Sequence, residues 1–388
     1  MKSYSLSLMG FVFTAVFVVA QLYLLIPATA LLKTVYGTSS TNISLLTSYF
    51  GFAYASGFLV WGTLSDRFGR KRILLIGLTG LTVTTAVLAL YNTQYETTLI
   101  LRIVQGFLAS AFPPVALAYI GESFPSHLRM KGIAWMSTAF LLAALIGQWL
   151  GGRLIVESIA MSMWLFAALY LIAVFLNTLL PTQEKIGPGE QVAEHSPPRF
   201  IDVAISTLTN IQLLRLYLIA LALLGSFVSL YTYLANNQDV ALPAGLTVSE
   251  LRIYAIPCMF APVFVGHALR RLGAERLIFL SLLVAALCLL GHTSVTGKGL
   301  FVAIHLLFVL SIATTVPSVI ALVTARSTPG NRGFAVSLYT FTLFVGASLG
   351  ALVPIILGNI TPYVATAAIG VAMVFNFPST LKQANENA

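Results

Sequence analysis

Long apolar segments, separated by short polar or charged loops, run along the whole chain. Uncharged stretches such as residues 73–95, 132–152 and 216–238 each hold about the 20 residues that a helix needs to cross a bilayer. The alternating strands of about ten residues that indicate a closed barrel do not occur. We therefore predict an all-α integral membrane protein. Twelve transmembrane helices are expected, at residues 5–32, 42–64, 73–93, 97–120, 131–153, 159–181, 211–235, 251–269, 277–294, 299–324, 333–357 and 361–379.

A polar segment divides the chain near its middle. Residues 183–198 are charged and rich in proline and glycine, which is typical of a solvated linker. We predict an N-terminal six-helix bundle at residues 1–181, a cytoplasmic linker at 182–210 and a C-terminal six-helix bundle at 211–388.

Composition and the placement of charge agree with a membrane protein. Hydrophobic residues make up 58% of the chain and charged residues 9%, against about 45–50% and 25% in soluble domains. The net charge of +9 comes mostly from loops on one side of the predicted helices, which the positive-inside rule places in the cytoplasm together with both termini. Nucleic acid is therefore not an expected partner. The apolar N-terminal segment continues past Pro27 and is expected to be an uncleaved first helix.

One loop carries a specific pattern. The twelve residues from Gly62 to Ile73 read GTLSDRFGRKRI, and a degenerate copy follows 204 residues later, beginning at Gly266. The first copy resembles the signature between helices two and three of the major facilitator superfamily, whose transporters consist of two repeated halves. The signature positions carried over from the resemblance are Gly62, Asp66, Arg67, Gly69, Arg70, Lys71 and Arg72.

The resemblance implies a charge cluster that closes the cytoplasmic face. Asp66 is then expected to face the eleventh helix near Gly333, where the positive end of a helix favours a carboxylate. The second copy has Arg270 and Ala274 in place of Asp66 and Arg70, so we expect the cluster to be one-sided. The alternative is a basic loop that only sets the topology.

The predicted fourth helix adds an arginine inside a span. Arg102, Gln105 and Gly106 resemble the family's R-x-x-Q-G pattern, and Glu122 lies at the inner end of the same span. Because a charge within the bilayer is costly, Arg102 is predicted to face a cavity and bind substrate, with Gln105 on the same helical face. The alternative is an arginine that reaches the outer interface. Glu122 is expected to join Arg70 in the inner charge cluster.

Helices one and five bear on the substrate class. Antiporters of cationic drugs often carry an acidic residue in helix one, where this chain offers Gln21 and Tyr23, so a neutral or anionic substrate is favoured. Helix five resembles the G-P-x-x-G-G pattern of the twelve-helix drug–proton antiporter branch, with Gln148 at the proline position between Gly147 and Gly151. The spacing of these two glycines is also what close helix packing requires.

Further polar residues are candidates for lining a cavity. Ser229, Tyr233 and Asn237 recur along helix seven, and Tyr339 lies in helix eleven. Packing or bonding within the helix is the alternative for each. His305 lies in helix ten, and because a histidine side chain ordinarily titrates near neutral pH, it is a candidate for proton coupling, together with Asp66 and Glu122.

No pattern in the sequence indicates an enzyme, a metal site or an ATP-binding loop, so no cofactor is expected beyond a proton gradient. We predict a monomeric, multi-pass protein of a bacterial-type inner membrane, in contact with lipid, that exports a small organic molecule by alternating access. A proton-coupled importer of a sugar or organic acid is the alternative of the same fold. A transporter-like sensor or assembly partner without flux is the alternative of another class.

Overall fold

The computed structural model describes residues 2–155, 157–181, 200–237, 241–328 and 331–386. These residues form helices joined by short turns, and no strand occurs among them, which confirms the predicted all-α fold. Ten stretches of the described residues are long and apolar enough to span a membrane. The last of them, Arg332–Asn376, contains two helices, and α3 adds a further helix of 29 residues.

The chain divides into two compact units. The first comprises Met1–Ile205 together with Pro329–Ser337, and the second comprises Ser206–Thr328 and Leu338–Ala388. The beginning of α16 therefore packs with the first unit. Within the predicted linker, residues 182–199 lie outside the described part of the chain, whereas Phe200–Leu208 forms the short helix α9.

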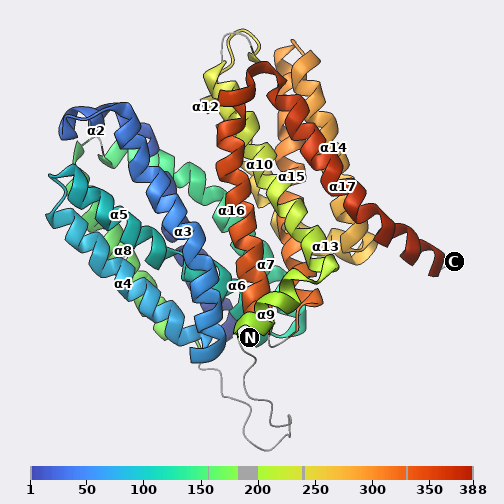
Figure 1. The fold of residues 1–388 in the computed structure, drawn as a ribbon, viewed down its shortest axis with the longest axis horizontal. Helices are drawn as coiled ribbons and strands as arrows, with labels where there is room; N and C mark the ends of the chain where they lie inside the picture. The colour runs from blue at the N-terminus through green and yellow to red at the C-terminus, as the bar shows by residue number, and fades with distance from the viewer. Residues whose placement is uncertain (1, 156, 182–199, 238–240, 329–330, 387–388) are drawn as a thin grey trace, which may run out of the picture. The chain divides into compact units, whose positions relative to one another are not determined.

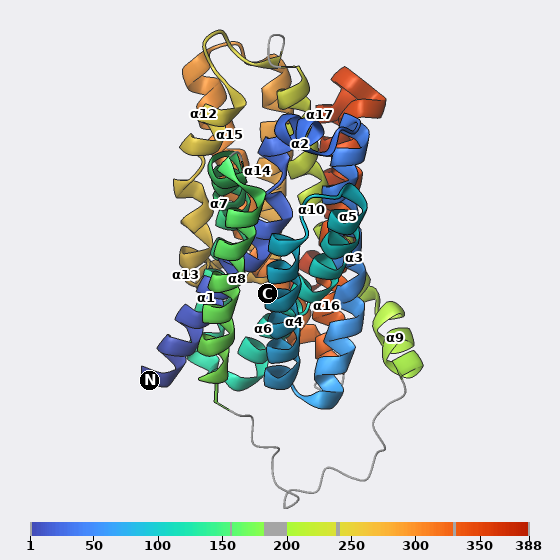
Figure 2. The same ribbon diagram turned by 90° about the vertical axis from the view of Figure 1, so that its left-hand side faces the viewer.

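The first unit is a bundle of helices, seen from two directions in Figures 1 and 2. Helix α4 packs on α8, α1 on α7, and α3 on α5. In order, the elements are α1 (Lys2–Tyr23), η1 (Ile26–Ala28), α2 (Thr29–Tyr36), α3 (Ser40–Phe68), α4 (Arg70–Leu90), α5 (Tyr95–Ala109), α6 (Phe112–Ser123), α7 (Ser126–Leu150), η2 (Gly151–Ile155), α8 (Ile159–Thr178) and the part of α9 up to Ile205.

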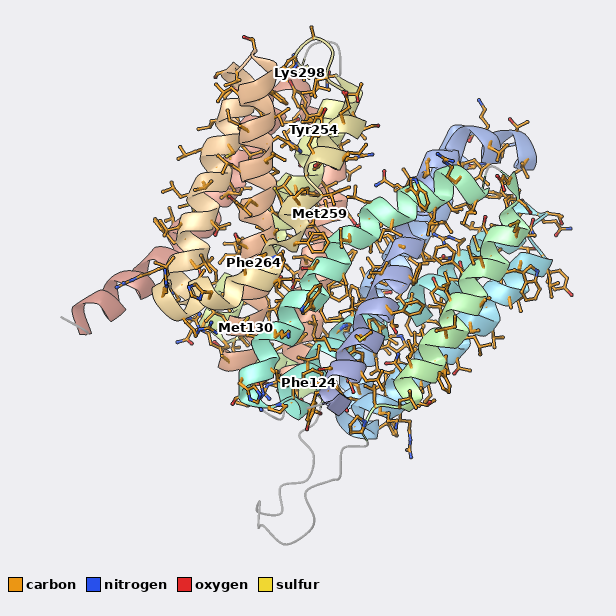
Figure 3. The ribbon with its side chains drawn as sticks, turned by 180° about the vertical axis from the view of Figure 1, so that it is seen from behind. Phe124, Met130, Tyr254, Met259, Phe264 and Lys298 are labelled. Carbon is orange, nitrogen blue, oxygen red and sulfur yellow. The ribbon has the colours of Figure 1, made fainter. Side chains whose placement is uncertain are left out.

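The second unit repeats this kind of packing: α14 contacts α15 and α17, and α10 contacts α17. Figure 3 labels Tyr254, Met259 and Phe264 along three successive short helices of this unit. In order, the elements are α10 (Ile211–Asn236), α12 (Val248–Tyr254), η3 (Pro257–Phe260), α13 (Ala261–Leu272), α14 (Ala274–Ser294), α15 (Lys298–Arg326), α16 (Arg332–Leu357), η4 (Gly358–Ile360) and α17 (Thr361–Glu386).

Three predicted helices are broken where prolines remove backbone donors. The first ends at Tyr23 rather than at residue 32, shortly before Pro27. The fourth divides between α5 and α6, with Pro113 in the first turn of α6. The eighth becomes α12, η3 and α13, and Pro257 begins η3.

Glycines at equivalent places allow two helix pairs to approach closely, one in each unit. A Cβ atom at Gly147 would meet the backbone of Ala20, so α7 and α1 touch there without a side chain between them. In the second unit, a Cβ atom at Gly346 would meet the backbone of Leu221 where α16 crosses α10. These contacts are the close helix packing that small residues four positions apart permit.

Candidate functional site

Arg70 is the centre of a charge cluster at one end of the first unit. Its side chain is only 4% exposed, and its Nε and Nη2 donate to the two carboxylate oxygens of Glu122, at 3.1 and 2.8 Å. Such a two-pronged pair fixes the guanidinium plane as well as the charge. Arg70 also forms an ion pair with Asp66, one helical turn earlier in the chain, and donates to the Ser65 hydroxyl. One arginine thus bridges α3, α4 and α6.

The Asp66 carboxylate lies at the beginning of α16, the place that the resemblance implies. The backbone N–H of Phe334 donates to it, and a Cβ atom at Gly333 would collide with its oxygens. A carboxylate at this end of a helix is favoured by the helix dipole. Partial burial raises the pKa of Asp66 above its usual value, although Arg70 and the Phe334 N–H act in the opposite direction. This carboxyl therefore binds a proton at a higher pH than an exposed aspartate does.

The remaining signature residues have structural or surface positions. Gly62 leaves room for Ser337 of α16, and Gly69 has a φ of 91°, which favours glycine in the turn between α3 and α4. Lys71 donates to the carbonyl of Leu180 at 2.6 Å. The side chains of Arg67 and Arg72 are exposed.

A second polar cluster is buried in the middle of the first unit around Arg102. This arginine is fully buried; its Nη1 donates to Gln105 Oε1 and its Nη2 to the backbone carbonyl of Gln21, both at 3.2 Å. Gln105 in turn donates to Thr85 at 2.9 Å. The Arg102 guanidinium stacks over the Phe50 ring, 4.1 Å from its centroid, which is a favourable cation–π arrangement.

This cluster leaves hydrogen-bonding capacity unused. Arg102 Nε and Gln21 Oε1 are both buried and have no partner among the described residues. None of the ion pairs formed within the described part of the chain includes Arg102. Arg102 therefore does not reach the outer interface, and its charge is met here by neutral groups. Tyr23, which follows Gln21 at the end of α1, is half-buried.

The second unit holds a hydrogen-bonded chain that the sequence interpretation missed. The Tyr231 hydroxyl lies 2.8 Å from His305 Nε2, and His305 Nδ1 lies 3.3 Å from His292 Nε2. The sequence singles out His305 alone, because the five histidines fall on different segments. The overlooked signal is that His292 and His305 flank one short turn, between the end of α14 at Ser294 and the beginning of α15 at Lys298. Two helices joined by so short a turn form a hairpin, which can bring residues of its two arms together.

The second unit also has an ion pair at the place that corresponds, by the 204-residue repeat, to the cluster around Arg70. Arg326 pairs with Glu275, which joins α15 to α14. Arg270, at the position equivalent to Asp66, is exposed, whereas Arg326, the repeat equivalent of Glu122, forms an ion pair.

The other predicted lining residues of this unit mostly bond to backbone. Ser229 donates to the carbonyl of Gly350 at 2.9 Å, and Asn237 donates to that of Tyr233. The hydroxyl of Tyr339 is buried with no partner among the described residues. On helix α7, Gln148 is half-buried between the packing glycines Gly147 and Gly151.

Comparison with known proteins identifies the family. The profile of the Major Facilitator Superfamily matches residues 11–351, so the chain belongs to this superfamily of membrane transporters and is not an enzyme. It is 26% identical to the uncharacterized MFS-type transporter YybF of Bacillus subtilis, over 80% of this chain and 76% of that protein. It is 32% identical to the chloramphenicol resistance protein CraA of Acinetobacter baumannii, over 62% of this chain and 55% of CraA. It is 26% identical to the multidrug resistance protein MdtG of Enterobacter lignolyticus, over 64% of this chain and 62% of MdtG.

Solved structures show the same fold. A bacterial homologue of the iron transporter ferroportin matches with a TM-score of 0.76 and 15% identity, over 97% of this chain and 99% of that one. The transporter FucP matches with a TM-score of 0.75 and 16% identity, over 96% and 98%. At these identities the likeness extends to the fold alone.

Proposed function

We propose that this transporter exports small organic molecules that are neutral or anionic, in exchange for protons. The buried Arg102 is the observation that supports a neutral or anionic substrate. Its guanidinium has no carboxylate partner among the described residues, and its Nε donor is unused. A buried charge without a counter-charge is costly, and a substrate carboxylate or strong acceptor would offset that cost. A cationic substrate would instead add to the positive charge.

The direction of transport is proposed from the relatives. CraA and MdtG are named for resistance to chloramphenicol and to multiple drugs, respectively, which is an export phenotype. The basic loops favour a cytoplasmic location for both termini in a bacterial-type inner membrane.

Proton coupling is proposed for the carboxyl groups of the inner cluster. Asp66 has a raised pKa, and Arg70 connects it to Glu122. Protonation of Asp66 would remove its attraction to Arg70 and to the N-terminal end of α16. The proton would thereby change the contact of α16 with α3, which is the kind of change that alternating access requires.

The test is a flux measurement with purified protein in liposomes and an imposed pH gradient. Efflux of an anionic or neutral drug against its gradient, driven by inward proton flow, supports the proposal. Accumulation in the direction of proton flow would identify an importer, the activity named for the xylose symporter XylE, which shares the fold. Absence of any flux across a broad substrate panel would favour a sensor.

A further inference from the structure

The direction of each hydrogen bond between Tyr231, His305 and His292 follows from their chemistry. His292 Nδ1 lies 2.6 Å from the carbonyl oxygen of Cys288, which can only accept, so this nitrogen carries a hydrogen. Both rings are buried, and His292 packs edge-on against Phe301 and Phe308, an environment that favours the neutral form.

A neutral imidazole has one N–H and one lone pair. His292 Nε2 must therefore accept from His305 Nδ1, and His305 Nε2 must accept from the Tyr231 hydroxyl. All three bonds thus run in one direction, from Tyr231 through His305 and His292 to the Cys288 carbonyl. No ring nitrogen of the pair has a lone pair left over.

We propose that His292 and His305 form a single one-proton site in the second unit, with Tyr231 as its gate. The proposal rests on the proposed proton coupling and adds a proton site apart from Asp66 and Glu122. When a proton from water binds, His305 Nε2 becomes a donor, the Tyr231 oxygen becomes its acceptor, and the hydroxyl hydrogen must turn to another partner. The N–H bond formed at Nε2 replaces an O–H bond of a hydronium ion, which leaves as water, and the pair gains one positive charge.

The site holds one proton and no more. At 3.3 Å, the bond between His292 Nε2 and His305 Nδ1 requires one donor and one acceptor, so two imidazolium rings are incompatible with it. The bound proton can lie on either nitrogen of this bond, which spreads the charge over both rings.

The neighbours of the site show where its charge would act. The guanidinium of Arg252, on α12, lies 5.6 Å from the centroid of the Tyr231 ring, and Cys258 of η3 is a further titratable neighbour of Tyr231. Cys288 faces His292 only through its backbone. Among the described residues neither histidine forms an ion pair with a carboxylate. Protonation of His305 therefore places a second cation near Arg252, and repulsion favours separation of α12 from α15.

The first experiment observes the tautomers directly. Protein labelled with ¹⁵N only at histidine is reconstituted in lipid, and its solid-state NMR spectrum is followed with pH; His292→Gln and His305→Gln assign the two signals. We expect both rings to be neutral with the hydrogen on Nδ1 at high pH, and a total uptake of one proton by the pair. Independent titration of the two rings, or two protons taken up, would overturn the proposal. Tyr231→Phe, which keeps the ring, should leave the hydrogen of both rings on Nδ1, because the bonds to Cys288 and between the two rings fix the tautomers, while the resonance of His305 Nε2 shifts as it loses its donor.

The second experiment measures transport driven by a pH gradient. His292→Gln and His305→Gln are each expected to lower this flux at least about tenfold, within the range of coupling between linked sites, while exchange of substrate at equal pH continues. His267→Gln, at an exposed histidine of the same unit, is the matched control and should behave as wild type. Unchanged gradient-driven flux in both site variants would refute the proposal. Wild-type protein without gradient-driven flux would refute the proposed function instead, because the NMR result does not depend on it.

Discussion

Glu122 and Arg326 occupy equivalent positions of the two repeats, 204 residues apart, and each forms an ion pair with a residue in the first turn of an earlier helix. In the first unit the pair is Glu122 with Arg70, and in the second it is Arg326 with Glu275, so the two charges are exchanged. Both units thus have an ion pair near the same place between these helices. The helix that carries the cation in one unit carries the anion in the other. An electrostatic link between these helices is therefore present in both halves, whichever helix carries the cation.

The exchanged pair leads to a first prediction. Glu275→Arg or Arg326→Glu alone places like charges together and should lower the melting temperature and the flux. The double variant restores the polarity of the first unit and should recover most of both. Because the pair is only partly exposed, the coupling is expected near or above the upper end of the ~0–1 kcal/mol typical of surface pairs. A double variant no better than the sum of the singles would contradict this.

The same logic applies to Arg70 and Glu122 in the first unit. The swap of Glu122→Arg with Arg70→Glu should recover more transport than either single change. Recovery is expected to be partial, because Arg70 also pairs with Asp66 and the swap places a second carboxylate beside that of Asp66. Flux in liposomes, normalised to the amount of inserted protein, measures it; purely additive losses would argue against the pairing.

For Asp66 we predict a loss of function without a loss of insertion. Asp66→Asn keeps the size of the side chain but removes the charge that holds Arg70 and the first turn of α16, so transport should fall severely while expression and membrane insertion stay near normal. Flux in reconstituted vesicles at matched protein amounts is the measurement. Wild-type flux in this variant would falsify the role of Asp66.

The pH dependence of Asp66 has a definite sign. Its folded-state pKa is raised, so its neutral form is the one that the fold favours. The stabilisation is fully present below the ordinary aspartate pKa of about 3.9 and is lost as pH rises through the higher folded-state value. Over that window the melting temperature of wild type relative to Asp66→Asn should fall with rising pH. A difference that is constant with pH would show that Asp66 does not titrate there.

The helix pairs can be predicted from the sequence, whereas several local features cannot. Hydropathy places α14 and α16 within a few residues of their observed bounds, because an uninterrupted apolar run must satisfy its backbone as a helix. It does not predict that Pro113 lies in the first turn of a new helix while its repeat equivalent Pro317 stays inside α15. The difference is that a second proline follows at position 114, which removes another backbone donor.

The candidate sites are predictable to different degrees. Asp66, Arg70 and Glu122 can be found together because a signature marks their positions in the chain. For His305 the sequence offers only the short turn between α14 and α15, and hydropathy does not fix how the two arms of this hairpin face each other, so it does not show that His292 contacts His305. The use of Ser229 and Asn237 for backbone bonds also depends on helix contacts that hydropathy does not encode.

The glycine contacts predict a contrast in stability. Gly147→Ala introduces a Cβ atom into the backbone of Ala20, and such overpacking typically costs about 1–3 kcal/mol. Gly370→Ala, in α17, has no atom within 4 Å of the new Cβ and is the matched control; it should be neutral or stabilising by up to about 1 kcal/mol. Thermal unfolding in detergent compares the two. Equal melting temperatures would show that α1 and α7 separate at little cost.

Arg102 gives the prediction that tests the substrate class. Arg102→Lys keeps the charge but loses the planar fork that reaches both Gln105 and the Gln21 carbonyl, so part of the binding should remain. Arg102→Ala should weaken binding of an anionic substrate about 10–100-fold, the equivalent of losing charge-assisted hydrogen bonds worth ~1.5–3 kcal/mol. Because Gln105 stays bonded to Thr85, the alanine variant should still fold, which a melting curve verifies. A neutral analogue of the same substrate serves as the ligand control and should lose less affinity than the anion. Equal losses for the two ligands would mean that Arg102 supports the shape of the site rather than the charge of its substrate.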